Sequence, residues 1–148
     1  MSKVQNIKIK TDLETQMQAQ SGQWSWENQF GADIVTIPAS HVLDFFGYAK
    51  SSGMFDQLMD VTAVDYSDRE KRFDVVYELF NTTQFTRLRV KVQLAMGEEV
   101  PTLTKIWRGA DWFERETYDM FGMKLTGHLN MRRIWTQHQF EGHALLKD

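Results

Sequence analysis

The stretch 72-RFDVVYELFNTTQFTRLRVKVQL-94 decides the fold. Apolar residues at positions 88, 90, 92 and 94 alternate with polar residues at 87, 89, 91 and 93, which is the two-residue period of a β-strand. Residues 73–80 alternate less strictly, and residues 81–86 form a connecting loop, so the pattern predicts an antiparallel hairpin. Its outward acids, Asp74 and Glu78, could face the outward bases Arg87, Arg89 and Lys91, and the register decides which pairs form.

Weaker signals on the amino-terminal side complete the predicted sheet and its helices. Residues 33–37 indicate a short strand ended by Pro38, and Ser40 is expected to cap a helix that buries positions 42, 45, 46 and 49 and ends at Gly53. Residues 58–66 favour a strand without clear alternation, typical of a central strand or one buried on both faces. A capping box at residues 11–14 predicts a short first helix reaching Met17, and residues 21–31 are expected to form a loop with aromatic anchors.

The carboxyl-terminal third divides into a helix and a tail. Residues 103–121 have apolar positions at helical spacing, with Gly122 as the terminator and Gly109 as a point of interruption. Residues 123–148 sustain no period and are expected to need a partner surface to become ordered. We therefore predict one α+β domain with a mixed or antiparallel sheet, in which a central hairpin is covered by helices. Residues 1–122 form the body, including this helix, and residues 123–148 form an extended partner-docking tail.

Composition excludes several classes of protein. A chain of 148 residues suits one core, and its net charge of −3 provides no basic face for nucleic acid. The absence of cysteine excludes disulfides, thiolate-bound zinc and cysteine-ligated iron–sulfur clusters. No glycine-rich nucleotide loop is present. With a mean hydropathy of −0.46 and no signal peptide, the chain is expected to be soluble or peripheral, in a cytoplasmic or matrix-like compartment.

The densest polar cluster lies on the predicted carboxyl-terminal helix and comprises Glu114, Arg115, Glu116 and Asp119. Arg115 and Asp119 stand four residues apart and are able to pair. Glu114 and Glu116 point in different directions, which argues against a catalytic pair of carboxylates. The preferred interpretation is a solvated or interface helix face.

Three histidines in the tail are the only candidates for a metal site. They are His128, His138 and His143, with Glu141 nearby. The five-residue spacing of His138 and His143, in a region without a helical signal, disfavours zinc, so these side chains are expected to position a loop. A small metal-dependent hydrolase that uses His128, Glu141 and His143 stays as a hypothesis from a different functional class.

Arg132 and Arg133 stand among large apolar residues, a mixture that favours burial against another protein. A salt bridge to Glu114 or Glu116 within the chain is the alternative, and both arrangements are compatible. The tryptophans of this region are interpreted as core or interface anchors rather than electron relays. They are Trp107, Trp112 and Trp135.

An ordered series of motifs in this chain resembles the 30-kilodalton subunit family, also called the C family, of respiratory NADH:quinone oxidoreductase (complex I). The series is 114-ERETYDMFG-122, Gly127-His128, 131-MRRI-134 and 140-FEGH-143, with 60-DVTAVDY-66, 72-RFDVVY-77 and 87-RLRVKV-92 in the body. The resemblance covers residues 34–148. The chain departs from the family at Leu129 and Asn130, which replace proline and aspartate, and at Trp135 and Ala144, which replace an aliphatic residue and proline.

The resemblance implies a cofactor-free accessory subunit in the hydrophilic arm of the proton-pumping complex, packed beside the large subunit that helps form the quinone pocket. FMN, iron–sulfur clusters, NADH and quinone would all be bound by partner subunits. The complex would catalyse electron transfer from NADH to quinone, and the isolated chain is expected to have no activity. Its position would be peripheral, on the cytoplasmic side of a bacterial inner membrane or on the matrix side in mitochondria.

The same resemblance implies structural or interface roles, and no catalytic, cofactor or metal role, for a set of motif residues. The set is Glu114, Arg115, Glu116, Asp119, His128, Arg132 and Arg133. An equivalent subunit of a membrane-bound hydrogenase or another related dehydrogenase is a second hypothesis, because such machines contain similar subunits.

Overall fold

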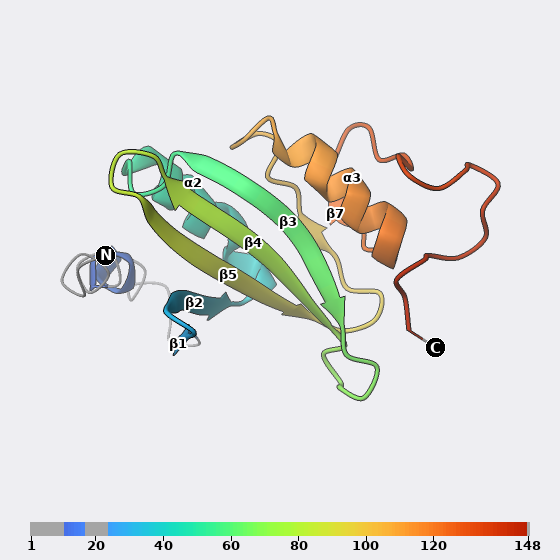
Figure 1. The fold of residues 1–148 in the computed structure, drawn as a ribbon, viewed down its shortest axis with the longest axis horizontal. Helices are drawn as coiled ribbons and strands as arrows, with labels where there is room; N and C mark the ends of the chain where they lie inside the picture. Colours follow the sequence, from blue (N-terminus) through green and yellow to red (C-terminus); the bar gives the residue numbers. More distant parts are fainter. Residues whose placement is uncertain (1–10, 17–23, 148) are drawn as a thin grey trace.

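The computed structural model describes residues 11–16 and 24–147, and Figure 1 shows their path. The central feature is a five-stranded sheet with the strand order β1-β2-β5-β4-β3, in which β2 and β5 are parallel and the other neighbours are antiparallel. The elements in chain order are β1 (Ser25–Gln29), β2 (Ala32–Ile37), the 3-10 helix η2 (Ala39–His41), α2 (Val42–Ser51), β3 (Gln57–Asp65), β4 (Phe73–Asn81), β5 (Thr86–Leu94), β6 (Val100–Pro101), α3 (Ala110–Phe121) and β7 (Leu125–Thr126).

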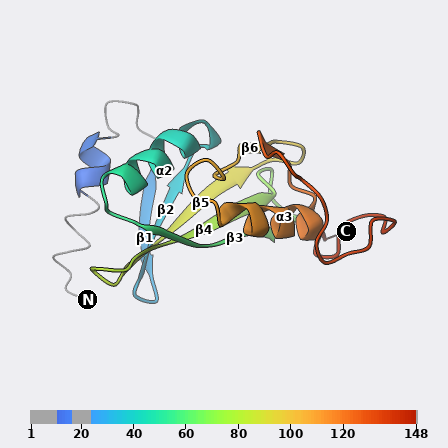
Figure 2. The same cartoon turned by 90° about the horizontal axis from the view of Figure 1, so that it is seen from above.

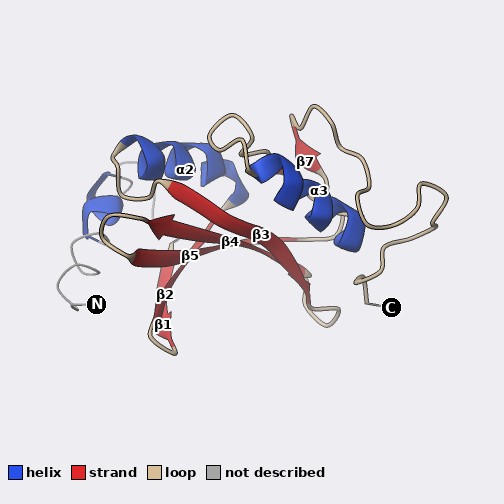
Figure 3. Cartoon of the chain, turned by 45° about the horizontal axis from the view of Figure 1, so that its top comes forward, coloured by secondary structure: helices blue, strands red, loops and turns tan. Residues whose placement is uncertain are grey.

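Two layers make up the body. Helices α2 and α3 lie on one face of the sheet, and the opposite face carries no helix of the described chain (Figure 3). The same layering is visible from above in Figure 2, where the tail extends beyond the end of α3. The predicted α+β class with a mixed sheet is therefore confirmed.

The predicted hairpin is confirmed as β4 and β5, which pair in register from Phe73 opposite Leu94 to Asn81 opposite Thr86. Their alternating apolar residues face the helices and are buried. On the outer face Glu78 lies opposite Arg89 and forms an ion pair with it. Asp74 lies opposite Gln93 instead of a base, and the Gln93 side-chain amide donates a hydrogen bond to Asp74 Oδ1 at 3.3 Å. Only one of the possible acid–base pairs across this hairpin therefore forms.

Two predictions about strands were wrong. Residues 25–29 form the strand β1 rather than a loop, because Phe30 and Gly31, both with positive φ, turn the chain back to pair with β2. Most residues of this strand are exposed on both faces, so its sequence does not alternate between apolar and polar residues and gives no strand signal. Residues 57–65 form the edge strand β3, not a central one, and a register shift between Leu58 and Asp60 explains why its alternation is poor. Residues 21–23 lie outside the described chain.

Helix α2 forms as predicted and buries Val42, Phe45, Phe46 and Ala49 against the sheet. The Phe46 and Tyr77 rings lie 4.8 Å apart, which joins this helix to β4. The start of α2 differs from the prediction, since Ser40 belongs to η2, His41 precedes the helix, and no side chain caps it. The predicted first helix is confirmed over residues 11–16, where Leu13 enters the same core, whereas Met17 lies outside the described chain.

Helix α3 is shorter than the periodic segment that predicted it. It begins after Gly109 and ends at Gly122, whose φ of 74° gives the left-handed conformation that closes helices. Residues 103–109 form turns and irregular structure instead of a first helical piece. Helix α3 packs along β3, and the Thr117 hydroxyl donates to the Val61 carbonyl at 2.9 Å. The edge strand of the sheet is thus covered by a helix.

Candidate functional site

The carboxylate of Asp119 fastens the tail to helix α3. One oxygen, Oδ2, accepts hydrogen bonds from the backbone N–H groups of Ile134, Trp135 and Thr136 at 3.0, 2.8 and 2.9 Å. The other oxygen, Oδ1, accepts from the Thr136 hydroxyl and from Arg133 Nη1, which is 2.9 Å away. Three successive backbone donors form a concave anion site, and here the anion is the chain's own side chain.

Asp119 needs these donors because its position is electrostatically unfavourable. It is fully buried and lies near the carboxyl terminus of α3, where the helix dipole disfavours negative charge. Burial works to raise the pKa of Asp119, but the hydrogen bonds from Thr136, Trp135 and Ile134 outweigh it and hold the pKa well below its usual range. The carboxylate is therefore charged at neutral pH.

The two neighbouring arginines extend this attachment. Arg133 bridges Asp119, the Thr136 hydroxyl and the Gly142 carbonyl, so it joins two parts of the tail to the helix. Arg115 Nε donates to the Arg132 carbonyl at 3.2 Å, and its Nη1 lies 3.6 Å from Asp111. The predicted pairing of Arg115 with Asp119 was wrong, because Asp119 is occupied by the tail and Asp111 stands four residues earlier on the same face.

Glu114 is buried between α3 and the irregular segment that follows β6. Its oxygens accept hydrogen bonds from the Leu103 N–H at 2.7 Å and from the Thr102 hydroxyl, and the side chain has no solvent exposure. Burial raises the pKa of Glu114 to about 7, and these two hydrogen bonds only partly oppose the shift. Glu116 on the other side of the helix is partly exposed. The helix face around Glu114 and Asp119 is therefore buried rather than solvated.

His128 lies beside this buried acid. Its Nδ1 accepts from the Asn130 N–H at 3.1 Å, and its Nε2 lies 3.4 Å from Asp111 Oδ1 and 3.8 Å from Glu114 Oε2. The Nε2 atom is buried and forms no hydrogen bond among the described residues. Tyr77, whose hydroxyl is also buried without a hydrogen-bond partner among the described residues, has a pKa raised by burial and by the charge of Glu114.

The structure does not bring the histidines of the tail together. His143 Nδ1 lies 2.9 Å from the Asp119 carbonyl oxygen at the far end of α3 from His128, and its ring packs against Gly122. His138 and Glu141 are exposed. Over residues 11–16 and 24–147, no group of three histidine, aspartate or glutamate side chains is arranged to hold a metal ion. The geometry needed for a hydrolase built on His128, Glu141 and His143 is thus missing.

A second attachment, which we did not predict from the sequence, holds the end of the tail. Arg72 makes a bidentate ion pair with buried Asp65 at 2.7 and 2.8 Å and also donates to the Lys147 carbonyl. The Lys147 N–H donates to the same carboxylate at 2.7 Å. The side-chain hydrogen bond with Arg72 lowers the pKa of Asp65. No spacing rule links residues 82 positions apart, so only the folded chain reveals this contact.

Aromatic side chains are exposed on the surface where the tail lies against α3. The Trp112 and Trp135 side chains are 51% and 63% exposed, and their rings meet edge to face at 6.4 Å. The Arg115 guanidinium lies 5.6 Å from the Trp112 ring. Arg132 is exposed, and its guanidinium pairs with neither Glu114 nor Glu116, while Arg133 pairs with Asp119. Trp107 differs, since it is buried and donates to the Asp56 carbonyl.

No helix of the described residues combines the length and apolar character needed to cross a membrane. The family model "Respiratory-chain NADH dehydrogenase, 30 Kd subunit" matches residues 35–148. The chain is 52% identical over 124 residues to the C-type subunit of NADH-quinone oxidoreductase from Sinorhizobium medicae, covering 82% of this chain and 62% of the relative. It is 44% identical over 126 residues to the same subunit from Ruegeria pomeroyi, covering 84% and 63%.

A third relative joins two subunits in one polypeptide. The C/D-type subunit of NADH-quinone oxidoreductase from Bdellovibrio bacteriovorus is 46% identical over 153 residues, a match that spans 100% of this chain and 26% of the relative. The chain therefore spans less than two thirds of these curated relatives. Among solved structures, a chain of the membrane-bound sulfane sulfur reductase, an archaeal respiratory membrane complex, has a TM-score of 0.75 at 24% identity, with 88% of this chain and 76% of that chain covered. That similarity shows a shared fold. By its family match and by its relatives, this chain belongs to the family of the respiratory-chain NADH dehydrogenase 30 Kd subunit.

Proposed function

We propose that this chain is an accessory scaffold subunit in the hydrophilic arm of a proton-pumping NADH:quinone oxidoreductase. The observation that carries the proposal is the family match over residues 35–148 together with relatives named as subunits of that enzyme. In this function the chain binds neither FMN nor an iron–sulfur cluster, and partner subunits bind these cofactors, NADH and quinone. The chain alone has no turnover, and the assembled complex does.

The partner in this proposal is the large quinone-site subunit, which corresponds to the D portion of the C/D relative. Fusion into one polypeptide suits two units that pack together, because a linker makes their association intramolecular. The chain then associates with the membrane only through the complex, on the cytoplasmic side in bacteria.

Residue roles in this proposal divide between the interior and the surface. Glu114, Arg115, Asp119, His128 and Arg133 make contacts within the chain that fix the tail against the body. Arg132 and Glu116, which the chain leaves at least partly exposed, contact partners. The tail from residue 123 onward thus forms a preformed docking surface rather than a segment that folds only on binding.

Affinity purification of the tagged chain from its source organism tests this function. The expected result is a membrane-extracted assembly that contains FMN and reduces quinone with NADH, whereas the same chain produced alone contains no flavin and has no such activity. Turnover by the isolated chain, or recovery only in a nickel-containing hydrogenase without flavin, contradicts the proposal.

A further inference from the structure

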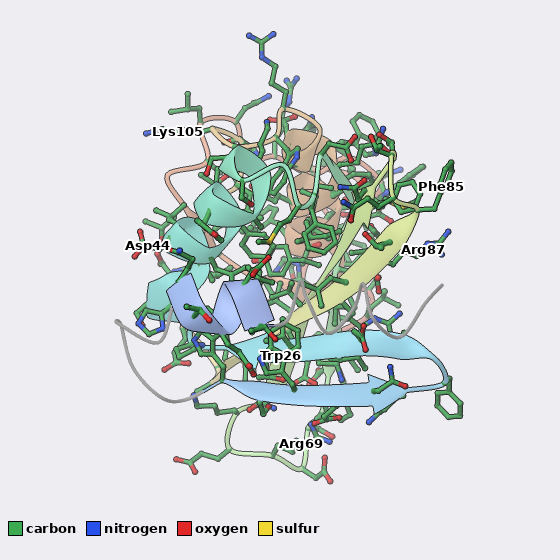
Figure 4. All side chains as sticks on the ribbon, turned by 90° about the vertical axis from the view of Figure 1, so that its left-hand side faces the viewer. Trp26, Asp44, Arg69, Phe85, Arg87 and Lys105 are labelled. Atoms are coloured by element: carbon green, nitrogen blue, oxygen red, sulfur yellow. The ribbon has the colours of Figure 1, made fainter. Side chains whose placement is uncertain are left out.

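An apolar recess of about 220 Å³ lies where one end of the sheet meets the end of α3 and the last part of the tail. This end of the β4–β5 hairpin is the one opposite its turn, and Figure 4 shows both ends, with Arg69 in the loop before β4 and Phe85 in the turn after it. The recess is lined mainly by apolar residues, which are Phe73, Met96, Phe121, Met123 and Leu146. An apolar cavity of about 150 Å³ is enough to bind benzene, so this recess has room for one aromatic ring with a small substituent. We call it the methionine recess.

The tail side of the methionine recess is held in place by hydrogen bonds to the end of α3. His143 Nδ1 lies 2.9 Å from the carbonyl oxygen of Asp119, and the Leu145 N–H donates to the Met120 carbonyl at 2.9 Å. These contacts fix the wall without help from a ligand. A ligand that enters the recess therefore loses little affinity to ordering of the chain.

His143 gives the recess one polar atom of defined character. The Asp119 carbonyl oxygen can only accept a hydrogen bond, so His143 Nδ1 carries the proton. A neutral imidazole has a single N–H, so Nε2 is an acceptor, and it forms no hydrogen bond within residues 11–16 and 24–147. Tyr118 meets the imidazole ring edge to face at 5.8 Å. Nε2 lies on the side of Gly122, another residue of the recess, where an added Cβ would stand only 2.8 Å away.

The charged residues of the recess are one acid and one base. Glu98 and Lys124 are both exposed, and neither forms an ion pair within the described part of the chain. Glu98 accepts a hydrogen bond from the Ala95 N–H at 2.7 Å. Their opposite signs select neither an anion nor a cation, and moving a charged ligand from water into apolar surroundings is unfavourable. The recess is therefore suited to a neutral ligand.

We propose that the methionine recess is a binding site for a small neutral phenol, whose ring lies among the phenylalanine and methionine side chains and whose hydroxyl donates to His143 Nε2. Phenylalanine rings and methionine sulfur atoms both make favourable contacts with an aromatic ring. The hydroxyl gives Nε2 a partner, whereas a plain hydrocarbon would cover this acceptor and leave it without a hydrogen bond. This site is independent of the proposed scaffold function.

NMR of the full chain with ¹³C-labelled methionine methyl groups tests the proposal. Of the eight methionines, Met96 and Met123 line the recess, while Met59 lies in β3 near the turn end of the hairpin and serves as the internal reference. Titration with p-cresol is expected to shift the Met96 and Met123 methyl signals to saturation and to leave Met59 unchanged. Toluene, which lacks only the hydroxyl, is expected to bind at the same place about fivefold more weakly.

Two variants separate the hydrogen bond from the space. His143→Asn keeps an amide N–H for the Asp119 carbonyl but has no atom at the position of Nε2, so p-cresol should lose its advantage over toluene. Ala95→Phe places a ring in the recess, and both ligands should then fail to bind.

Matched controls use residues away from the recess. Met96→Ala should weaken both ligands, whereas Met59→Ala, which removes an equally exposed kind of side chain, should weaken neither. Phe85 is 71% exposed at the hairpin turn, so Phe85→Ala tests for unspecific binding to exposed rings and is expected to have no effect. Circular dichroism of each variant verifies that it is folded.

Three results would overturn the assignment. The first is the absence of saturable shifts at Met96 and Met123 with p-cresol. The second is equal affinity for p-cresol and toluene in the wild type, or a preference for p-cresol that persists in folded His143→Asn. The third is tighter binding of N-acetyl-tyrosinamide than of p-cresol, which would assign the recess to a tyrosine side chain of another protein. Each result leaves the scaffold function unaffected.

Discussion

Replacing Asp119 by asparagine measures how strongly the chain holds its own tail. Asparagine has nearly the same shape but keeps a single oxygen, so it retains at most the three backbone donors of residues 134–136. Its amide group then faces Arg133 Nη1, which is a donor 2.9 Å from the present carboxylate. The substitution therefore removes an ion pair, weakens the remaining bonds and places two donors against each other.

The expected cost follows from these contacts. Hydrogen bonds to a charged group contribute about 1.5–3 kcal/mol each against about 1 for neutral ones, and breaking one side of a buried ion pair costs about 3–5 kcal/mol. We expect Asp119→Asn to lower the free energy of tail release by about 3 kcal/mol, since part of the loss is recovered by the retained oxygen. An opening free energy lower by that amount makes the open state about 150-fold more populated.

Amide hydrogen exchange at residues 134–136 provides the assay, with the amides of β4 and β5 as the internal reference. Exchange of the tail amides is expected to accelerate by the factor above while the strands stay protected. Asp111→Asn is the control on the same helix, because its side chain is 43% exposed and should change stability by less than about 1 kcal/mol. Unchanged protection at residues 134–136, or an equal loss in the tail and the strands, would refute the reasoning.

The pH dependence of this attachment has a defined sign. The pKa of Asp119 is lowered by folding, so its contribution is fully present above the unfolded value near ~4 and is lost only as the pH falls toward the folded pKa. Tail release in the wild type is thus expected only under strongly acidic conditions, and the asparagine variant should show a flat profile there.

Three further predictions concern other contacts of the body and tail. For Glu114, folding raises the pKa from 4.5 to about 7, so its own contribution to stability is fully present below pH 4.5 and falls by about 3 kcal/mol as the pH rises through 7. Glu114→Gln should abolish this contribution, which urea unfolding at pH 5 and pH 8 measures, and an unchanged difference between the two pH values contradicts the prediction. Arg72→Gln should accelerate hydrogen exchange of the Lys147 amide, which donates to Asp65. Arg69→Gln is the control, because the Arg69 side chain is exposed and should not affect this amide. Equal effects of the two substitutions would show that the ion pair of Arg72 with Asp65 does not hold the tail. A chain ending at residue 122 loses the buried side chains of Met123 and Leu125, whose burial contributes about 1.5–3 kcal/mol each to stability. It should therefore unfold at a lower temperature than a chain ending at residue 130. Equal thermal stabilities of the two chains would disprove this prediction.

The elements that could be predicted are those whose periodicity reports burial on one face. Strand β5 and helix α2 each bury one side, so their apolar residues recur at the period of the element. Strand β1 could not be predicted in this way because it is an exposed edge, and β3 could not be placed because its irregular register disturbs the alternation. Edge strands are located by their neighbours rather than by their own composition.

The sequence singled out most of the residues that the structure brings together around α3, but it did not predict which of them pair. The cluster from Glu114 to Asp119 and the two arginines of the tail were identified, yet the sequence could not say that Asp119 binds the tail while Arg115 turns to Asp111. Arg115 was predicted to pair with the acid four residues after it, whereas it pairs with Asp111, four residues before it. An acid that precedes its base by four residues is the more favourable order on a helix. The burial of Glu114 left no trace in the sequence, because a charged residue on a helix is usually exposed.

The hydrogen bond from the Thr117 hydroxyl to the Val61 carbonyl, which ties α3 to β3, affects how this chain can bind other proteins. An uncovered outer strand invites a foreign strand to extend the sheet through its main-chain groups, which is sequence-tolerant and prone to aggregation. With α3 lying along β3, that route is closed on this side of the sheet. Contacts made here must rely on side chains, which discriminate between partners, so a helix that shields an edge also makes recognition selective.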